Sequence, residues 1–185
     1  MTHALKRFCR NVRGAAAVEF ALLLPLMLII WGGIVEIGNV HFAGRKVALA
    51  TQSIADLIAQ ERAVSDAELA NLAQAGNAIM FPYPSGNMSY RMESIATDAD
   101  GGIDATLGWQ RSFGATGDGG TPATPPQVND FLLSNDSTIY VRVAYTYTPV
   151  SVLGNIAGIS AVLEGLAFTE EAFAKPRRIN IIPIQ

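Results

Sequence analysis

Residues 15–35 read AAAVEFALLLPLMLIIWGGIV, and this apolar run decides which folds the chain can adopt. Glu19 is the only charged residue in it. An α-helix rises about 1.5 Å per residue, so roughly 20 residues cross the hydrocarbon core of a bilayer. The run therefore predicts a transmembrane helix. The alternative is a buried core helix, which is usually shorter or carries a polar face.

Charge is distributed unevenly on the two sides of this run. Four basic residues precede it: Lys6, Arg7, Arg10 and Arg13. Arg45 and Lys46 follow it, and the larger number of basic residues on the first side places the N-terminus in the cytoplasm. The remainder of the chain has more acidic than basic residues, which disfavours a nucleic-acid partner.

The junction between the basic and apolar residues reads Arg13-Gly14-Ala15-Ala16-Ala17-Val18-Glu19-Phe20. An ordinary secretory signal is cut after its apolar core, where this chain has no suitable small residues followed by a polar stretch. A glycine at the border, with a glutamate five residues later, is the arrangement that prepilin peptidases cut. We therefore expect cleavage between Gly14 and Ala15, which removes the leader 1–14 and leaves the helix attached.

Glu19 has two interpretations, because a carboxylate on a transmembrane helix costs a few kcal/mol. It lies at the cytoplasmic interface and reaches water, or it pairs with the new α-amine of Ala15 on a neighbouring subunit. The glycine at the matching spacing favours the second interpretation. We assign Glu19 and Phe20 to subunit assembly.

Helical periodicity continues beyond the apolar run. Val40, Val47 and Ile54 are seven residues apart, and so are Ala43, Ala50 and Leu57. The pattern predicts one helix from about Ala15 to Gln60 whose second half packs on a globular domain. Ser65 and Glu68 fit a capping box that begins a second helix of about 14 residues, which Pro82 and Pro84 end.

After Pro84 the period changes to two residues, which predicts antiparallel strands with one buried face. The expected strands are Met88–Glu93, Ile103–Gln110 and Ile139–Tyr147, with Leu166–Ala174 and Ile179–Ile184 as candidate last strands. Asp100-Gly101-Gly102 suits a turn between the first two. Gly114–Asp130 is expected to be a long surface loop, and Val150–Leu163 a segment packed on the core.

The expected fold class is therefore α+β and pilin-like, with a long N-terminal transmembrane and amphipathic helix packed on an antiparallel sheet. The expected domains are the cleaved leader 1–14, the transmembrane helix 15–38 and an extracytoplasmic domain 39–185.

Residues suited to catalysis or metal binding are scarce. Cys9 is the lone cysteine, and the two histidines are His3 and His41. Asp98–Asp104 resembles the start of a calcium loop, but Trp109 stands where an EF-hand needs glutamate, so a charged hairpin turn is the better interpretation. We expect no enzyme, no cofactor and no metal.

The residues from Arg13 to Leu22 resemble the start of TadE/TadG-like pseudopilins, the minor pilins of tight-adherence, Flp-type (type IV) pili of bacteria. Shorter similarities to this family follow along the chain: Ser53–Gln60, Met80-Phe81-Pro82, Gly108–Arg111, Tyr145–Pro149 and Pro176-Arg177-Arg178. The N-terminal motif is the specific part of the resemblance.

The resemblance implies cleavage at Gly14-Ala15 by a dedicated aspartic prepilin peptidase. It implies an inner-membrane subunit with a cytoplasmic N-terminus and a periplasmic C-terminal domain, which reaches the cell surface after assembly. Its partners would be other pilins and the assembly platform, and its role would lie in pilus initiation, at the tip or in assembly. The alternative is an uncleaved, signal-anchored envelope protein whose periplasmic domain binds a partner or ligand.

Overall fold

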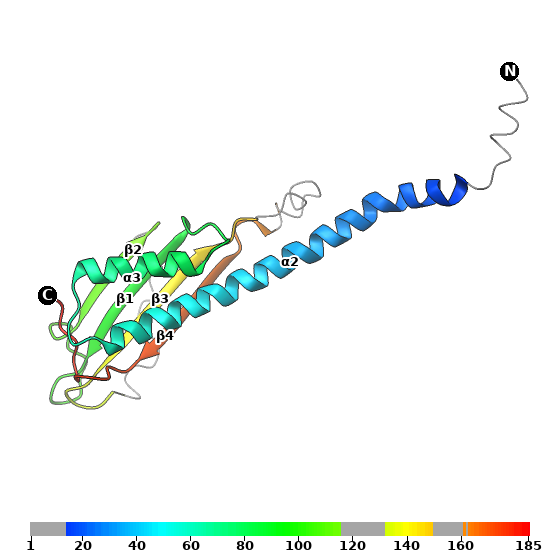
Figure 1. Cartoon of the computed structure of the whole chain (residues 1–185). Helices are drawn as coiled ribbons and strands as arrows, with labels where there is room; N and C mark the ends of the chain where they lie inside the picture. Colours follow the sequence, from blue (N-terminus) through cyan, green and yellow to red (C-terminus); the bar gives the residue numbers. More distant parts are fainter. Residues whose placement is uncertain (1–13, 116–131, 150–160, 162) are drawn as a thin grey trace, which may run out of the picture. The chain divides into compact units, whose positions relative to one another are not determined.

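The computed structural model describes residues 14–115, 132–149, 161 and 163–185. Across these ranges the chain forms two helices and four strands, labelled in Figure 1: α2 (Ala15–Gln60), α3 (Asp66–Ile79), β1 (Met88–Ala96), β2 (Trp109–Gly114), β3 (Ser137–Thr146) and β4 (Ala167–Ala174). The expected α+β class is confirmed.

α2 is one helix of 46 residues, with the bounds that the sequence predicts and with Pro25 inside it. The chain divides into two compact units within this helix. One unit contains α2 up to Asn39, and the other comprises Val40–Thr148 and Leu163–Gln185. We call the second the globular unit.

The predicted apolar stripe on the second half of α2 is confirmed over most of its length. Its fully buried members are Ala43, Val47, Ala50 and Ile54. Leu57 was expected to continue the stripe, but it is 44% exposed, and Ile58 and Ala59 are buried in its place. An α-helix has 3.6 residues per turn, so a strict seven-residue repeat drifts around it and a different residue faces the core.

The ends of α3 are held by three side chains. Ser65 Oγ accepts a hydrogen bond from the Glu68 N–H at 3.3 Å, and the Glu68 carboxylate accepts one from the Ser65 N–H at 2.8 Å. This confirms the predicted capping box, and hydrogen bonds from Ser65 lower the pKa of Glu68. At the other end, Lys46 Nζ donates to the Ile79 carbonyl at 2.9 Å, which ties α3 to α2.

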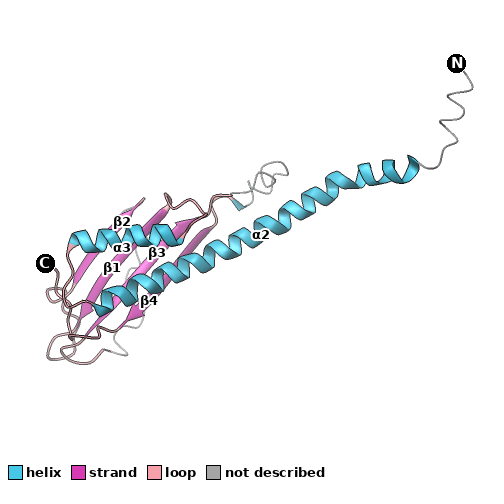
Figure 2. Ribbon diagram, in the orientation of Figure 1, coloured by secondary structure: helices cyan, strands magenta, loops and turns pink. Residues whose placement is uncertain are grey.

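The sheet has the strand order β2-β1-β3-β4, and each neighbouring pair is antiparallel. Within the globular unit, α3 and the second half of α2 cover the same face of the sheet (Figure 2). The strand residues that face the helices form much of the core: Met88, Tyr90, Met92, Ile139, Val141, Val143 and Tyr145. The predicted alternation of side chains between two faces is thus confirmed for β1 and β3, but the prediction of a single buried face is wrong, because residues on both faces of these strands are buried.

Side chains at the intervening positions point to the opposite face, where they pair by charge. Arg91 and Glu93 form an ion pair with a nitrogen–oxygen distance of 3.0 Å. Arg142 of β3 lies 3.9 Å from Glu171, its register partner on β4. This face also holds a second, smaller apolar cluster, in which Ile95 and Tyr140 are buried and Phe173 packs against them.

The second predicted strand, Ile103–Gln110, is wrong apart from its last two residues, because β2 begins at Trp109. Asp104 Oδ1 accepts the Thr106 N–H at 2.7 Å, and the Leu107 N–H donates to the Asp104 carbonyl at 3.3 Å. These local bonds hold a turn in place of an extended strand. Apolar alternation over Ile103–Trp109 did not reveal that competition.

The last predicted strand, Ile179–Ile184, is also wrong: Lys175–Gln185 forms an irregular segment that we call the C-terminal strap. Trp109 Nε1 donates to the Ile182 carbonyl at 2.9 Å, and the Val64 N–H donates to the Pro183 carbonyl at 3.1 Å. Ile182 is fully buried. The strap bonds to different elements in turn, and Pro183 has no N–H for a ladder, so no regular strand forms.

Two further predictions fall largely on residues that the structure leaves out. Of the expected loop Gly114–Asp130, Gly114 ends β2 and Ala115 follows it, while residues 116–130 lie outside the described residues. Of the expected core segment Val150–Leu163, residues 150–160 and 162 also lie outside them.

Gly108 is expected to be intolerant of any side chain. A Cβ placed there would lie 2.2 Å from the Ser94 carbonyl oxygen on β1, and backbone cannot move aside cheaply. Gly108→Ala should lower the free energy of unfolding by about 1–3 kcal/mol, measured by chemical denaturation of the full chain in detergent. Gly86→Ala is the matched control, because its Cβ would meet nothing within 4 Å. Equal stability of the two variants would contradict this packing.

Candidate functional site at the start of α2

Gly14 and Ala15 form the boundary at which α2 begins. Gly14 is exposed and directly precedes the helix, and a Cβ placed on it would meet nothing within 4 Å. Ala15 is the first helical residue. Within the described residues, no packing protects the bond between them.

Glu19 and Phe20 lie in the following turn of α2, so the helix brings the predicted site residues together. Glu19 is exposed, and Phe20 is 58% exposed. Residues four apart lie on the same helix face, which places Glu19 beside Ala15. The first turns of a helix favour a carboxylate, because the macrodipole is positive there. The Glu19 carboxylate can therefore pair with an amine near the start of a helix, and Phe20 presents an exposed aromatic ring beside it.

The apolar run itself is uncovered. Every residue from Gly14 to Trp31 is exposed, and only 11% of the most apolar 18-residue window is buried. This overturns the core-helix alternative, because a core helix of a soluble domain is mostly buried. Of the described residues, α2 is the one helix long and apolar enough to cross a membrane. The large apolar side chains exposed in this run include Leu22, Leu23, Leu26, Met27, Ile30 and Trp31.

Glu36 is a residue that the sequence analysis missed. It is fully buried although it is acidic, and it takes part in a polar interaction. Gly32, one turn earlier on the same face, is buried as well. Glu36 lies just beyond the apolar run of residues 15–35, and no residue spacing reveals that it is buried.

The Asp98–Asp104 segment of the globular unit is a turn, as expected, and its carboxylates bond to its own backbone. Asp98 Oδ1 accepts the N–H groups of Asp100 at 3.0 Å and Gly102 at 2.8 Å. Hydrogen bonds from Thr106 lower the pKa of Asp104. Among the described residues no group of three or more potential metal ligands occurs.

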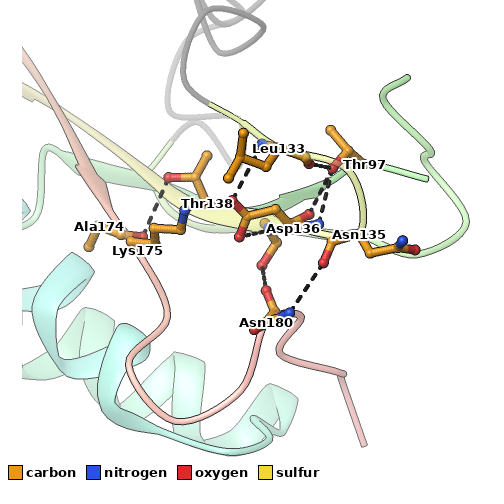
Figure 3. A network of polar contacts seen from close by, with 9 residues as sticks. Thr97, Leu133, Asn135, Asp136, Thr138, Ala174, Lys175 and Asn180 are labelled. Atoms are coloured by element: carbon orange, nitrogen blue, oxygen red, sulfur yellow. Dashed lines mark hydrogen bonds and ion pairs between the residues drawn. The ribbon is translucent and has the colours of Figure 1, made fainter. Parts of the chain in front are cut away.

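Asp136 is the centre of a polar network that joins three connections of the globular unit (Figure 3). Its carboxylate lies 2.6 Å from the Lys175 ammonium and accepts the Ser137 N–H at 2.9 Å. Its backbone carbonyl accepts the Thr97 N–H at 2.9 Å. Ser137 Oγ donates to the Asn180 carbonyl at 2.6 Å, which adds the C-terminal strap. The network fixes the start of β3 against the end of β1.

The charge of Asp136 is set by two opposing effects. Burial alone would raise the pKa of its carboxyl group. Hydrogen bonds from Lys175 and from the Ser137 and Leu133 N–H groups outweigh burial, so the pKa falls below its ordinary value. Asp136 therefore stabilises the fold in its charged form.

Comparison with known proteins identifies one family over the start of the chain. The family described as TadE-like protein matches residues 14–56. This stretch begins at Gly14 and contains Ala15, Glu19 and Phe20, and it confirms the resemblance found in the sequence. No curated protein and no solved structure matches the chain.

Asp136→Asn should lower the free energy of unfolding at neutral pH by about 1–3 kcal/mol, because it removes the charge that faces Lys175. A depressed carboxyl pKa stabilises the fold above the unfolded value of about 3.9 and ceases to do so as pH falls through the folded value. The difference from the wild type should therefore shrink in acid.

The measurement is chemical denaturation of the full chain in detergent from pH 7 to pH 3. Asp100→Asn, on an exposed residue of the neighbouring turn, is the control and should be nearly silent. A difference for Asp136→Asn that stayed constant down to pH 3 would contradict the role of its charge.

Proposed function

We propose that the chain is a minor pilin of a tight-adherence type IV pilus, with a structural rather than an enzymatic role in pilus initiation, at the tip or in assembly. The carrying observation is the exposed apolar helix that begins directly after Gly14, inside the stretch that matches TadE-like proteins. The proposed partners are a prepilin peptidase, other pilins and the assembly platform.

The exposed helix explains how one subunit can exist in two environments. In the inner membrane, residues 15–38 would be covered by lipid, with the N-terminus in the cytoplasm and the globular unit in the periplasm. In a filament at the cell surface, neighbouring helices would cover the same side chains. Lipid tails are as apolar as leucine, so the hydrophobic effect hardly distinguishes these states, and close packing and polar pairs decide between them.

Glu19 supplies such a polar pair in this proposal. Cleavage after Gly14 creates an α-amine on Ala15, which is one turn of helix away from Glu19 on the same chain. In a filament, the amine of one subunit can reach Glu19 of the next, and burial strengthens attraction between the charges. An unpaired buried carboxylate is costly, so the pair would select a specific helix register. Phe20 adds apolar contact beside it.

The globular unit supports a minor position in the pilus. Residues 40–148 and 163–185 have their own core and a four-stranded sheet, which a simple shaft subunit consisting of little more than a helix would not need. The competing function is an uncleaved envelope protein that binds a partner or ligand through this unit. The two functions share one topology and differ at Gly14.

Processing at Gly14 is the first test. The mature protein from its own host should begin at Ala15, as read by N-terminal sequencing. Gly14→Leu should leave the full-length chain, because a bulky residue blocks peptidase recognition and meets no neighbour in the fold. Gly38→Ala, another glycine with open space around it, should be cleaved normally. An intact leader on the wild-type protein would favour the envelope-protein function.

Glu19→Gln is the second test, read by complementation of a deletion strain. Membrane level and leader cleavage should be normal while piliation is lost, because glutamine keeps the size of glutamate but cannot pair with an amine by charge. The variant Glu61→Gln, which changes an exposed acid just after α2, should assemble pili normally. Normal piliation by Glu19→Gln at native expression would remove Glu19 from assembly.

A further inference from the structure

We propose that the globular unit rests on the outer surface of the inner membrane through a patch of three exposed apolar side chains at one of its ends. The membrane-facing patch consists of Phe42 on α2, Phe81 after α3 and Leu166 before β4. The proposal rests on the transmembrane topology given above and goes beyond it, because a tethered domain need not touch the bilayer.

Two contacts bring the parts of this patch to the same level of α2. Lys46 Nζ bonds to the Ile79 carbonyl at 2.9 Å, which holds the end of α3, and with it Phe81, beside this turn. A Cβ at Gly44 would lie 3.1 Å from Cε1 of Phe168, so the start of β4 also approaches α2 here. Phe42 and Leu166 each lie two residues away from this second contact.

The patch side chains take no part in the core of the globular unit. Phe81 is 80% exposed, Phe42 56% and Leu166 40%. Three large apolar side chains from separate segments are thus exposed to solvent at one end of the globular unit. Grouped exposure of this kind marks an interaction surface, whereas single exposed apolar residues are ordinary.

The covalent link to the membrane helix selects lipid as the occupant. The globular unit begins at Val40, and the predicted transmembrane residues end at 38, inside the same continuous helix. Phe42 therefore lies only about 6 Å along the axis from the last transmembrane residue. The polar layer on each side of the hydrocarbon core is about 5–8 Å thick, so the patch is within reach of the headgroups.

The chemistry of this end of the unit suits an interface rather than a charged partner. Phenylalanine and leucine partition into the boundary between headgroups and acyl chains, and a cation nearby is attracted by anionic lipid. Arg45 is exposed in the same turn of α2, while Glu164 is exposed near Leu166. The opposing charges leave apolar insertion as the main attraction. The tether also keeps the local lipid concentration high, so weak insertion is sufficient.

The test uses the full chain in vesicles of phosphatidylethanolamine and phosphatidylglycerol. Cys9 is changed to Ser, and one environment-sensitive dye is placed by Gly86→Cys, at an exposed site that leaves Phe81 intact and has open space. Lipids with a spin label near the headgroup should quench this dye. A dye placed by Leu133→Cys, at an exposed residue just before β3, is the control and should keep its fluorescence.

A second substitution tests the patch itself. Phe81→Ser should reduce the quenching of the dye at residue 86, and Leu133→Ser should leave that quenching unchanged. Quenching that needs high protein density in the vesicle would show contact between copies and overturn the proposal. Equal quenching at residues 86 and 133, or none at either, would overturn it as well.

A dye placed by Ile30→Cys separates failure of the patch from failure of the topology. Lipids labelled deep in the acyl chain should quench it if residues 15–38 span the bilayer. Quenching at residue 30 without quenching at residue 86 overturns the docking alone. Absence of quenching at residue 30 overturns the transmembrane topology, and the docking proposal with it.

Discussion

Close packing of the second half of α2 on the sheet is the contact on which the globular unit depends. Small residues allow it: Ala43, Ala50 and Ala59 are fully buried, and Gly44 faces the ring of Phe168. A larger residue at these places would push the helix away from β3 and β4. The bonds of Lys46 to α3 and of Arg177 to Ala59 can form only while that spacing is kept.

The two halves of α2 differ in how their apolar side chains are buried. In the second half, one stripe of apolar side chains is buried, although Phe42, Leu49 and Leu57 lie off it and are exposed. Between Val18 and Trp31, the large apolar side chains on all sides of the helix are exposed. Burial of apolar surface is worth about 25 cal/mol per Å², so this first half is unstable in water without a cover. The structure of one chain is therefore incomplete by itself, which is the physical argument for a bilayer and then for neighbouring subunits.

The fold was predictable where a local sequence pattern, such as hydrophobic periodicity or a capping motif, was not opposed by other interactions. The 46-residue helix, the capping box at Ser65 and the alternation in β1 and β3 all follow from such patterns. Prediction failed where polar groups outweighed an apolar pattern: Asp104 folds residues 104–107 into a turn, and Pro183 lies in an irregular strap. The site residues near Gly14 were visible as a motif. Buried Glu36 was not, because burial of an acid depends on tertiary contacts that spacing does not encode.

The C-terminal strap has a consequence for the order of events during synthesis. Ile182 fills the core beside elements formed from residues 43–73, and the Gln185 N–H bonds to the Val64 carbonyl. Contacts between such distant parts of a chain form slowly, because a long loop must close first. In the proposed topology, a chain threaded across the membrane would thus keep this core open until residue 182 had left the export channel. Export and folding would be separated in time, with the translocated chain requiring protection from proteolysis and aggregation in the interval.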